Sequence, residues 1–392
     1  MTRIDTCPAC GAGGLEVFHR AAGVPTNSCL LLEDPEEARD FPRGNLELAF
    51  CGACGFITNV VFDPSRAEYS GRYEETQGYS ATFVEFGRNL AKRWVEAYDL
   101  HGEHVLEIGC GKGEFLTWMV EAGAGSGVGI DPGVDPERLE TGAAERIAWI
   151  ADFYDDRYAH LQADAIVCRH TLEHIHPVSD FLHTVRRNIG DRRDAVVLFE
   201  LPDTLRVLRE VAFWDVYYEH CSYFTIGSLI RLFRSCGFDV LDASYAYEDQ
   251  YLLIEARPGG SGDDRSKLST DVADVAALAR RFGARFEEQA RAWHDRIAAI
   301  VGRGGRVALW GGGSKAVAFL TTLGDRSLID VVVDINPRKQ GRYIAGTGHP
   351  VVGPETLPDL APELVVAMNP VYAPEIASAL DDLKLSARLE SL

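Results

Sequence analysis

Four cysteines in two short pairs are the first side chains of this sequence with an evident chemistry. Cys7 and Cys10 form one C-x-x-C pair, and Cys51 and Cys54 form the second. Each pair can point two sulfurs at one ion from a tight turn, and four thiolates are usual ligands of a tetrahedral zinc ion. The spacing therefore predicts a structural zinc site that holds an N-terminal lobe together and keeps no open position for catalysis.

A glycine-rich segment, E-I-G-C-G-K-G at residues 107–113, directly follows an apolar run. Glycines let a backbone turn sharply and approach a ligand closely. The acidic start and the order E-x-G-C-G-x-G resemble the first motif of class I S-adenosylmethionine (SAM) methyltransferases, where the loop packs against the amino-acid part of the cofactor. Asp131 ends the next apolar run, where an acid can bind both ribose hydroxyls, and residues 152–153 match the place where that family contacts adenine. The predicted cofactor contacts are Glu107, Gly109, Gly111, Gly113, Asp131, Asp152, Phe153 and Arg169.

Two further segments are rich in titratable groups and follow predicted strands. The first contains His174, and the second contains Tyr217, Glu219 and His220. Such a set offers a base near neutrality, a carboxylate to orient it and a phenol to polarise an oxygen. We therefore expect His220 or Tyr217 to take a proton while Glu219 orients the base. His174 lies in an L-E-H-I sequence common to methyltransferases of many substrates, so it can equally shape the cofactor pocket.

A second glycine loop, W-G-G-G-S-K-A at residues 310–316, lies between a predicted strand and a predicted helix. Asp334 follows about twenty residues later, which imitates a dinucleotide fingerprint. The G-x-G-x-x-G pattern is incomplete because Ala316 holds its last place, so an NAD site is disfavoured. Ser314 and Lys315 are predicted substrate contacts, since a lysine at a helix N-terminus suits a phosphate. The alternative is that this loop only caps a small sheet.

Alternating strand and helix patterns must position these groups. A helical period begins near residue 83, and β-rich apolar runs separated by helical stretches then predict a mostly parallel sheet with crossover helices. The predicted strands of this sheet are residues 105–108, 127–130, 165–168, 195–199 and 251–256.

The remaining parts of the chain form smaller units. The stretch between the two cysteine pairs is expected to be irregular, and P-G-G-S-G-D-D at residues 258–264 is the clearest linker. A long amphipathic helix is predicted over about 270–300, followed by a smaller α/β unit with strands at 306–310, 330–334 and 364–368. The predicted domains are a zinc-binding domain (1–70), a methyltransferase core (71–257) and a C-terminal unit (258–392).

Composition narrows the possible partners. The 392 residues carry 39 Lys and Arg against 59 Asp and Glu, a net charge of −20, which disfavours a nucleic-acid partner. Apolar runs stay well short of the roughly 20 residues of a membrane span, and the first residues lack a signal-peptide pattern. Nine cysteines suit a reducing compartment, so we expect a cytoplasmic protein with no membrane partner.

Taken together, the cysteine pairs, the SAM loop, the Y-x-E-H-x-S-Y-F segment at 217–224 and the C-terminal unit resemble the sugar C-methyltransferases of antibiotic deoxysugar pathways. The resemblance covers nearly the whole length in the same domain order. It implies an α/β fold: a class I (Rossmann-like) SAM methyltransferase core with a small N-terminal zinc-binding domain and a C-terminal half-Rossmann domain. It also implies a nucleotide-linked 4-keto-6-deoxyhexose as substrate, methylated at the carbon beside the ketone.

The resemblance carries residue roles as well. It implies catalytic roles for Tyr217, Glu219, His220 and His174, and a C-terminal unit that closes over the substrate and holds its nucleotide diphosphate. A further family tyrosine, upstream of the SAM loop, falls near Tyr73 or Tyr79, both predicted substrate contacts.

This sequence also departs from the family pattern. Tyr218, also a predicted substrate contact, stands where the family often has histidine, and the loop at 311–316 lacks the usual G-x-x-x-K-G. Residues 73–80 are unlike the characterised sugar enzymes. These departures do not change the expected architecture, but they put the identity of the substrate that the resemblance implies in doubt.

Three functions follow from these observations. The first is a SAM-dependent C-methyltransferase that removes a proton alpha to the ketone of a nucleotide-linked keto-deoxysugar, or of a similar small secondary metabolite. The second is an O- or N-methyltransferase on the same scaffold, for which the Tyr/Glu/His set would be over-equipped. The third is a non-catalytic zinc-ribbon binding module with a degenerate core, against which the intact loop at 107–113 argues.

Overall fold

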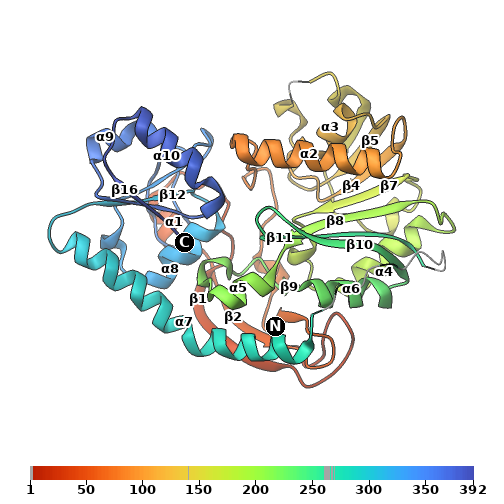
Figure 1. Cartoon of the computed structure of the whole chain (residues 1–392), viewed down its shortest axis with the longest axis horizontal. Coiled ribbons are helices and arrows are strands. Elements are labelled where there is room, and N and C mark those ends of the chain that lie inside the picture. Colours follow the sequence, from red (N-terminus) through yellow and green to blue (C-terminus); the bar gives the residue numbers. More distant parts are fainter. Residues whose placement is uncertain (1–2, 140, 260–264, 266–267, 269) are drawn as a thin grey trace.

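Three β-sheets organise the chain in the computed structural model, which describes residues 3–139, 141–259, 265, 268 and 270–392 (Figure 1). Of the predicted linker at 258–264, residues 260–264 lie outside the described residues. The α-helices are α1 (Pro35–Arg39), α2 (Ala81–Ala97), α3 (Glu114–Glu121), α4 (Val178–Ile189), α5 (Thr204–Glu210), α6 (Ile226–Ser235), α7 (Val272–Val301), α8 (Ser314–Leu323), α9 (Leu357–Leu360) and α10 (Ala373–Asp382). The strands are β1 (Glu16–Pro25), β2 (Arg43–Phe50), β3 (Ile57–Asn59), β4 (His104–Ile108), β5 (Ser126–Ile130), β6 (Ile147–Ile150), β7 (Ala165–Arg169), β8 (Val196–Pro202), β9 (Ser222–Tyr223), β10 (Phe238–Ala246), β11 (Tyr251–Pro258), β12 (Val307–Trp310), β13 (Val331–Val333), β14 (Val351–Val352), β15 (Leu364–Ala367) and β16 (Arg388–Ser391).

The central sheet has seven strands in the order β10-β11-β8-β7-β4-β5-β6, and β11 runs in the direction opposite to the other six. Helices α2 and α3 pack on one face, while α4 and α6 pack on the other. The five strands predicted for this sheet are confirmed. The sequence missed β6 and β10, because β6 buries only Ile147 fully and β10 carries an interrupted alternation at the edge of the sheet. This layered α/β arrangement is Rossmann-like, as expected for a class I methyltransferase core.

Helix α2 fixes where the preceding chain lies. Its N-cap is Ser80, whose hydroxyl accepts a hydrogen bond from the main chain of Phe83. Phe83, Leu90 and Trp94 recur at helical spacing and face the core. The chain just before Ser80 is thereby held above the carboxyl edge of the central sheet.

The N-terminal sheet differs from the irregular lobe expected between the cysteine pairs. It is antiparallel, in the order β1-β2-β3-β9, and two of its strands lie between those pairs. Strand β2 alternates exposed and buried side chains, which suits one covered face. Strand β9 comes from the part of the chain predicted as the methyltransferase core and begins two residues after His220. The predicted catalytic segment is therefore attached to the N-terminal sheet.

The C-terminal unit is a five-stranded parallel sheet in the order β14-β13-β12-β15-β16. Helix α7, predicted over 270–300, is present, packs against β1 through Phe282 and Phe18, and continues to this unit (Figure 1). One hydrophobic cluster contains side chains of β2, α5, α7, α8 and the C-terminal sheet. The N-terminal sheet and the C-terminal unit thus share a continuous core.

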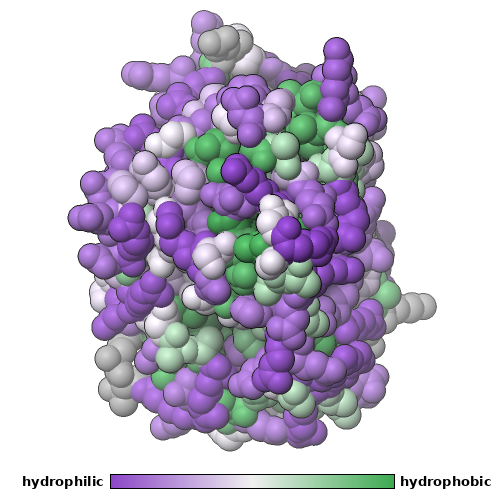
Figure 2. Space-filling model, turned by 90° about the vertical axis from the view of Figure 1, so that its left-hand side faces the viewer, coloured by the Kyte–Doolittle hydropathy of each residue, from purple (hydrophilic) through white to green (hydrophobic). Residues whose placement is uncertain are grey.

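The outer face on the side of the C-terminal unit is mainly hydrophilic, with hydrophobic residues showing between hydrophilic ones towards its middle (Figure 2). In the described part of the chain, no helix combines the length and the apolar character needed to cross a membrane.

Candidate active site

A cavity of about 1150 Å³ opens at the carboxyl edge of the central sheet. Its walls come from three parts of the chain: residues 67–80, the loops after the core strands, and the facing edge of the C-terminal unit. Ligands of open α/β sheets bind at this edge. The cavity therefore contains the place where both glycine loops and both titratable segments were expected to act.

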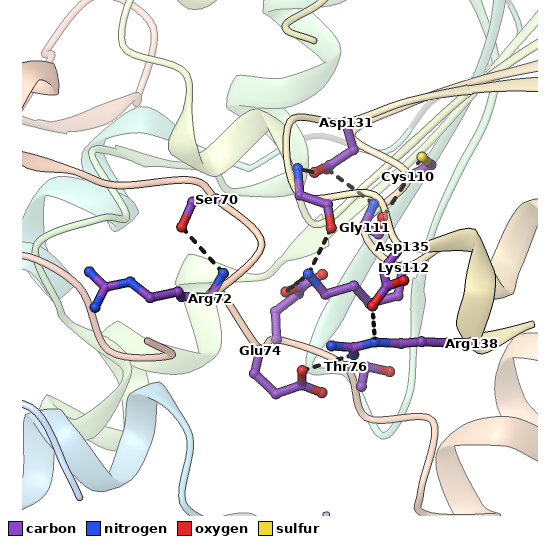
Figure 3. A network of polar contacts seen from close by, with 12 residues as sticks. Ser70, Arg72, Glu74, Thr76, Cys110, Gly111, Lys112, Asp131, Asp135 and Arg138 are labelled. Carbon is purple, nitrogen blue, oxygen red and sulfur yellow. Dashed lines mark hydrogen bonds and ion pairs between the residues drawn. The ribbon is translucent and has the colours of Figure 1, made fainter. Parts of the chain in front are cut away.

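The core loop lies between β4 and α3 and forms one end of this cavity. Gly109, Gly111 and Gly113 all have positive φ angles, of 69°, 52° and 91°. A Cβ atom at Gly109 would lie 2.1 Å from the hydroxyl oxygen of Thr171, so a larger residue has no room. Asp131, at the end of β5, accepts hydrogen bonds from the main-chain nitrogens of Gly111 (3.1 Å) and Gly133 (2.6 Å) (Figure 3).

The groups around this loop fit the SAM that the motif implies. Glu107 is buried, and one of its carboxylate oxygens has no hydrogen-bond partner among the described residues. Burial raises the pKa of Glu107 to about 8. An orphaned buried oxygen beside a glycine cradle is what a polar ligand with a cationic amino-acid part would complete. The loop and its neighbours would hold the amino-acid part of SAM, and Asp131 would hold the ribose.

The remaining predicted cofactor contacts also line the cavity. Phe153 is 59% exposed, while Asp152 beside it accepts a hydrogen bond from the hydroxyl of Tyr158 at 2.7 Å. Arg169 is buried, and its guanidinium donates to Glu200 at 2.9 and 3.1 Å. Arg169 therefore acts as a fixed part of the wall, since its charge is already paired.

Three of the four predicted catalytic side chains meet in the cavity. The ring of His220 lies edge-on to that of His174, with the centroids 4.7 Å apart. The centroid of the Tyr217 ring lies 4.2 Å from that of His220. Burial lowers the pKa of His220 well below its ordinary value and raises the pKa of Tyr217 well above its own. Both side chains are consequently neutral near pH 7.

The tautomer of His174 follows from its contacts. Its Nδ1 lies 3.1 Å from the main-chain oxygen of Glu219, and a carbonyl can only accept, so we assign the ring hydrogen to Nδ1. The hydroxyl of Tyr69 lies 3.0 Å from the same nitrogen. Burial lowers the pKa of His174 to about 4, which keeps the ring neutral and leaves Nε2 with its lone pair.

Tyr69 was missed from the sequence, which pointed to Tyr73 or Tyr79. Tyr73 lines the cavity and packs against Tyr69 with ring centroids 5.5 Å apart, whereas Tyr79 lies at the rim and is 44% exposed. A tyrosine four residues before Tyr73 was visible in the sequence, but nothing local linked it to a histidine more than one hundred residues away.

Glu219 differs from its expected role. Its carboxylate is buried away from the imidazole rings, and it accepts hydrogen bonds from the side chains of Asn27 (3.1 Å) and Ser28. The hydroxyl of Ser314 lies 2.7 Å from that of Ser28 and 3.4 Å from the carboxylate. Burial raises the pKa of Glu219 to about 7. Glu219 thus joins the N-terminal lobe, the core and the C-terminal loop, and touches His174 only through its main chain.

Tyr218 also differs from its expected role. Its side chain is 1% exposed, packs on Gly44 and Phe62, and shares hydrogen bonds with the main chain of Asp63. The ring points into the N-terminal lobe, where no substrate atom can reach it. Tyr218 is therefore a core residue of the interface between the lobe and the core.

Lys315 lines the cavity as part of an ion-pair network. Its Nζ lies 2.6 Å from one oxygen of Asp215, and Arg206 lies 2.6 Å from the other. Arg206 also pairs with Glu210 at 2.8 Å, so the two cations of this wall are balanced by two carboxylates. The sequence missed Arg206 and Asp215, because neither lies in a recognisable motif.

The four cysteines converge as predicted. Their sulfurs all lie within 4.8 Å of one another, and the pairs Cys7–Cys54 and Cys10–Cys51 are each 3.7 Å apart. A tetrahedral zinc ion with Zn–S bonds of about 2.3 Å places its ligands about 3.8 Å apart. The described geometry therefore fits a zinc ion bound by four thiolates.

Comparison with known proteins agrees with this architecture. Residues 80–243 match the family described as "Methyltransferase domain", and residues 269–386 match the "C-methyltransferase C-terminal domain". The chain is 27% identical over 395 residues to the C-methyltransferase NovU of Streptomyces niveus, and this match covers 95% of the chain and 91% of NovU.

Shorter matches concern other methyltransferases. The ribosomal protein L11 methyltransferase of Actinobacillus succinogenes is 29% identical over 141 residues, which cover 34% of this chain and 43% of that protein. The solved structure of the N,N-8-amino-8-demethyl-D-riboflavin dimethyltransferase RosA from Streptomyces davawensis matches with a TM-score of 0.37 and 23% identity, covering 45% of this chain and 56% of RosA.

The two domain matches and the full-length relative favour an enzyme over a non-catalytic binding module. These matches support a SAM-dependent methyltransferase in which residues 80–243 are similar to a methyltransferase domain and residues 269–386 are similar to a C-methyltransferase C-terminal domain.

Proposed function

We propose that this enzyme transfers the methyl group of SAM to a carbon alpha to a ketone of a nucleotide-linked keto-deoxysugar or a similar small metabolite. The observation that carries the proposal is the meeting of His174, Tyr217 and His220 in the cavity that also contains the cofactor loop. A hydroxyl or amine acceptor needs at most one base. A carbon acceptor needs a base and a proton donor together.

SAM, when bound, supplies an electrophilic methyl group. The enzyme's own residues then have to create a nucleophilic carbon on the acceptor. We assign proton removal to His220, which is neutral and faces the cavity. Tyr217 keeps its proton because burial raises its pKa, so its hydroxyl can donate to the developing enolate oxygen. His174, held through Nδ1 by Glu219 and Tyr69, presents its second nitrogen as an acceptor beside them.

The substrate's anionic part is assigned to the wall that contains Lys315. Lys315 and Arg206 are the cationic donors of this wall, and they are held there by Asp215 and, for Arg206, also by Glu210. A diphosphate would gain charge-assisted hydrogen bonds there. Ser314, on the same loop, is placed to contact the linked sugar.

The test is substitution of the assigned base. His220→Asn should lower kcat by about 10²–10⁴-fold, the usual contribution of general acid–base catalysis, while leaving the affinity for S-adenosylhomocysteine (SAH) unchanged. The matched control is His176→Asn, because His176 lines the same cavity but stacks on Phe62. In the unaltered enzyme without SAM, a deuterated acceptor should lose its label to water. Full activity of the His220→Asn, Tyr217→Phe double variant would refute the assignment. An O- or N-methyl group in the NMR spectrum of the product would show that the acceptor atom is oxygen or nitrogen and not carbon.

We further propose that the cysteine tetrad binds structural zinc. Metal analysis should find about one zinc ion per chain, since four thiolates complete its tetrahedral shell. Removal of the ion with a chelator should lower the melting temperature while SAH affinity of the folded fraction stays the same. Unchanged stability after complete chelation would contradict a structural role. The nearly isosteric variant Cys10→Ser offers a second measurement, because it removes one thiolate ligand at the exposed corner of the site.

A further inference from the structure

Residues 69–80, here called the cover segment, pass over the cofactor end of the cavity and contribute much of its wall. Glu74, which is fully buried, anchors the segment on two sides. Its carboxylate accepts from Arg138 of the core at 2.8 Å and from Asn336 of the C-terminal unit at 2.9 Å. Figure 3 shows Glu74 and Arg138 beside the glycine loop. The segment is therefore a fixed part of the site, although its residues 73–80 depart from the family pattern.

The next residue, Glu75, points the other way, onto the glycine loop. Its Oε1 would lie 2.7 Å from a Cβ atom at Gly111, so its carboxylate rests directly on the loop. Its Oε2 is buried and has no hydrogen-bond partner among the described residues. The nearest cation, Lys112 Nζ, is 3.9 Å away and already donates to the main-chain oxygen of Gly133 at 2.8 Å. The side chain as a whole is 33% exposed and lines the cavity, so a ligand bound there can supply the missing donor.

We propose that the Glu75 carboxylate binds the α-ammonium group of SAM and so completes the cofactor site from the cover segment. In class I methyltransferases the glycine loop packs against the amino-acid part of the cofactor, and the ammonium is the group there that calls for an anion. Other acids near the loop are engaged: Glu114 accepts from Thr76 at 2.6 Å, and both oxygens of Asp131 accept main-chain hydrogens. Glu107 also has a free oxygen, but this residue of β4 is only 2% exposed, whereas the side chain of Glu75 is 33% exposed and lines the cavity.

The electrostatics of the site agree with this assignment. Burial raises the pKa of Glu75 to about 8, and the favourable charge of Lys112 offsets only part of that effect. The charges of Asp131 and Glu114 act in the same direction as burial. Near pH 7 the carboxyl therefore keeps its proton until a cation arrives. Binding of an ammonium group should ionise it and release a proton to solvent.

The test compares two ligands in calorimetric titrations of the full-length protein. SAH contains the α-ammonium group, whereas 5′-methylthioadenosine keeps the adenosine and the thioether but lacks the amino-acid part. Glu75→Gln should weaken the binding of SAH by at least about tenfold, since a buried charge pair loses one partner. The affinity for methylthioadenosine should stay within about twofold of that of the unaltered protein. The matched control is Glu68→Gln, on the same stretch of chain but pairing with the exposed Arg72. Glu68→Gln should change neither affinity.

Two outcomes would overturn the proposal: unchanged SAH affinity in Glu75→Gln, or an equal loss for both ligands, which would mean that Glu75 only shapes the cavity. A second measurement needs no variant. Titrations of the unaltered protein in buffers of different ionisation enthalpy should show proton release with SAH and none with methylthioadenosine, and absence of release with SAH would count against the proposal. These readouts depend on cofactor binding alone, so they stand or fall separately from the acceptor proposed above.

Discussion

Two glycine loops in this chain share one local design and have different surroundings. One connects β4 to α3 in the core, and the other connects β12 to α8 in the C-terminal unit. In each, an aspartate from the next strand of the sheet accepts a hydrogen bond from a loop glycine: Asp131 from Gly111 at 3.1 Å, and Asp334 from Gly312 at 2.8 Å. The strand, the turn and the acid are therefore the same construction used twice.

The walls around the two loops differ. Thr171 and Trp149 close on the core loop, so its glycines are required by packing as well as by φ. Around Gly313 of the C-terminal loop, a Cβ atom would meet nothing within 4 Å. The side chain of Lys315 leaves that loop to pair with Asp215 of the core. A glycine motif thus determines a turn, and the neighbouring elements determine what the turn can bind.

The largest expected difference comes from adding one methyl group to each loop. Gly109→Ala should reduce SAH affinity by at least about thirtyfold, because a left-handed alanine and a clash with Thr171 together cost on the order of 1–3 kcal/mol or more. Gly313→Ala, at a φ of −107° and facing open space, should leave SAH affinity unchanged. Calorimetry with SAH measures both. Equal losses in the two variants would show that the loops are functionally alike.

A smaller effect is expected from the lysine of each loop. Lys315→Met should raise the KM for the acceptor about tenfold, the loss of one charged hydrogen bond, and leave SAH affinity unchanged. Lys112→Met should instead weaken SAH binding and leave the KM for the acceptor unchanged, because Lys112 is buried beside the cofactor loop and donates a hydrogen bond to the main-chain oxygen of Gly133. Steady-state kinetics with both substrates varied separates the two. A rise in the SAH dissociation constant for Lys315→Met would contradict the division of labour between the loops.

The smallest effect concerns pH. Burial raises the pKa values of Glu75 and Glu107 beside the core loop to about 8, so their contribution to stability is full below about pH 4.5 and is lost as pH rises through 8. Glu173 and Glu219, at about 8 and 7, act in the same direction. In the C-terminal unit, burial lowers the pKa of His349 to about 4, so its contribution is full above about pH 6.5 and is lost as pH falls through 4.

The melting temperature of the ligand-free protein should accordingly fall by a few degrees between pH 6 and pH 9, as each kcal/mol shifts it by about 2–4 °C. Glu75→Gln should reduce this alkaline fall, whereas His349→Asn should reduce only the loss below pH 6. Thermal unfolding followed by calorimetry at matched ionic strength provides the measurement. An alkaline fall that is the same in Glu75→Gln and the unaltered protein would remove Glu75 from the groups responsible.

Local sequence patterns were enough for the fold and for part of the site. The cysteine spacing, the E-x-G-C-G-x-G loop and the apolar strand runs each specify a short-range geometry, and the structure brings the four sulfurs together and forms the loop and the predicted strands. Strand β10 was not predicted, because an edge strand with an interrupted alternation of buried and exposed residues has only a weak sequence pattern.

The segment 217–220 shows where local patterns stop. Four adjacent residues were all expected at the active site, yet Tyr217 and His220 line the cavity while Tyr218 and the carboxylate of Glu219 point into the N-terminal lobe. This segment lies outside regular secondary structure, so no period relates the directions of neighbouring side chains. Packing against the lobe decides them.

The sequence by itself predicted the cysteine tetrad, the glycine loop after β4 and the layered α/β fold, because each carries a short local pattern: two C-x-x-C pairs, one glycine motif and a series of apolar runs. Only the tertiary structure decided which tyrosine contacts His174, which residues hold Glu219, and that Glu75 rests on the cofactor loop. Those contacts join residues that are 36 to 192 positions apart. Their formation depends on how three sheets pack around one cavity, which no local pattern encodes.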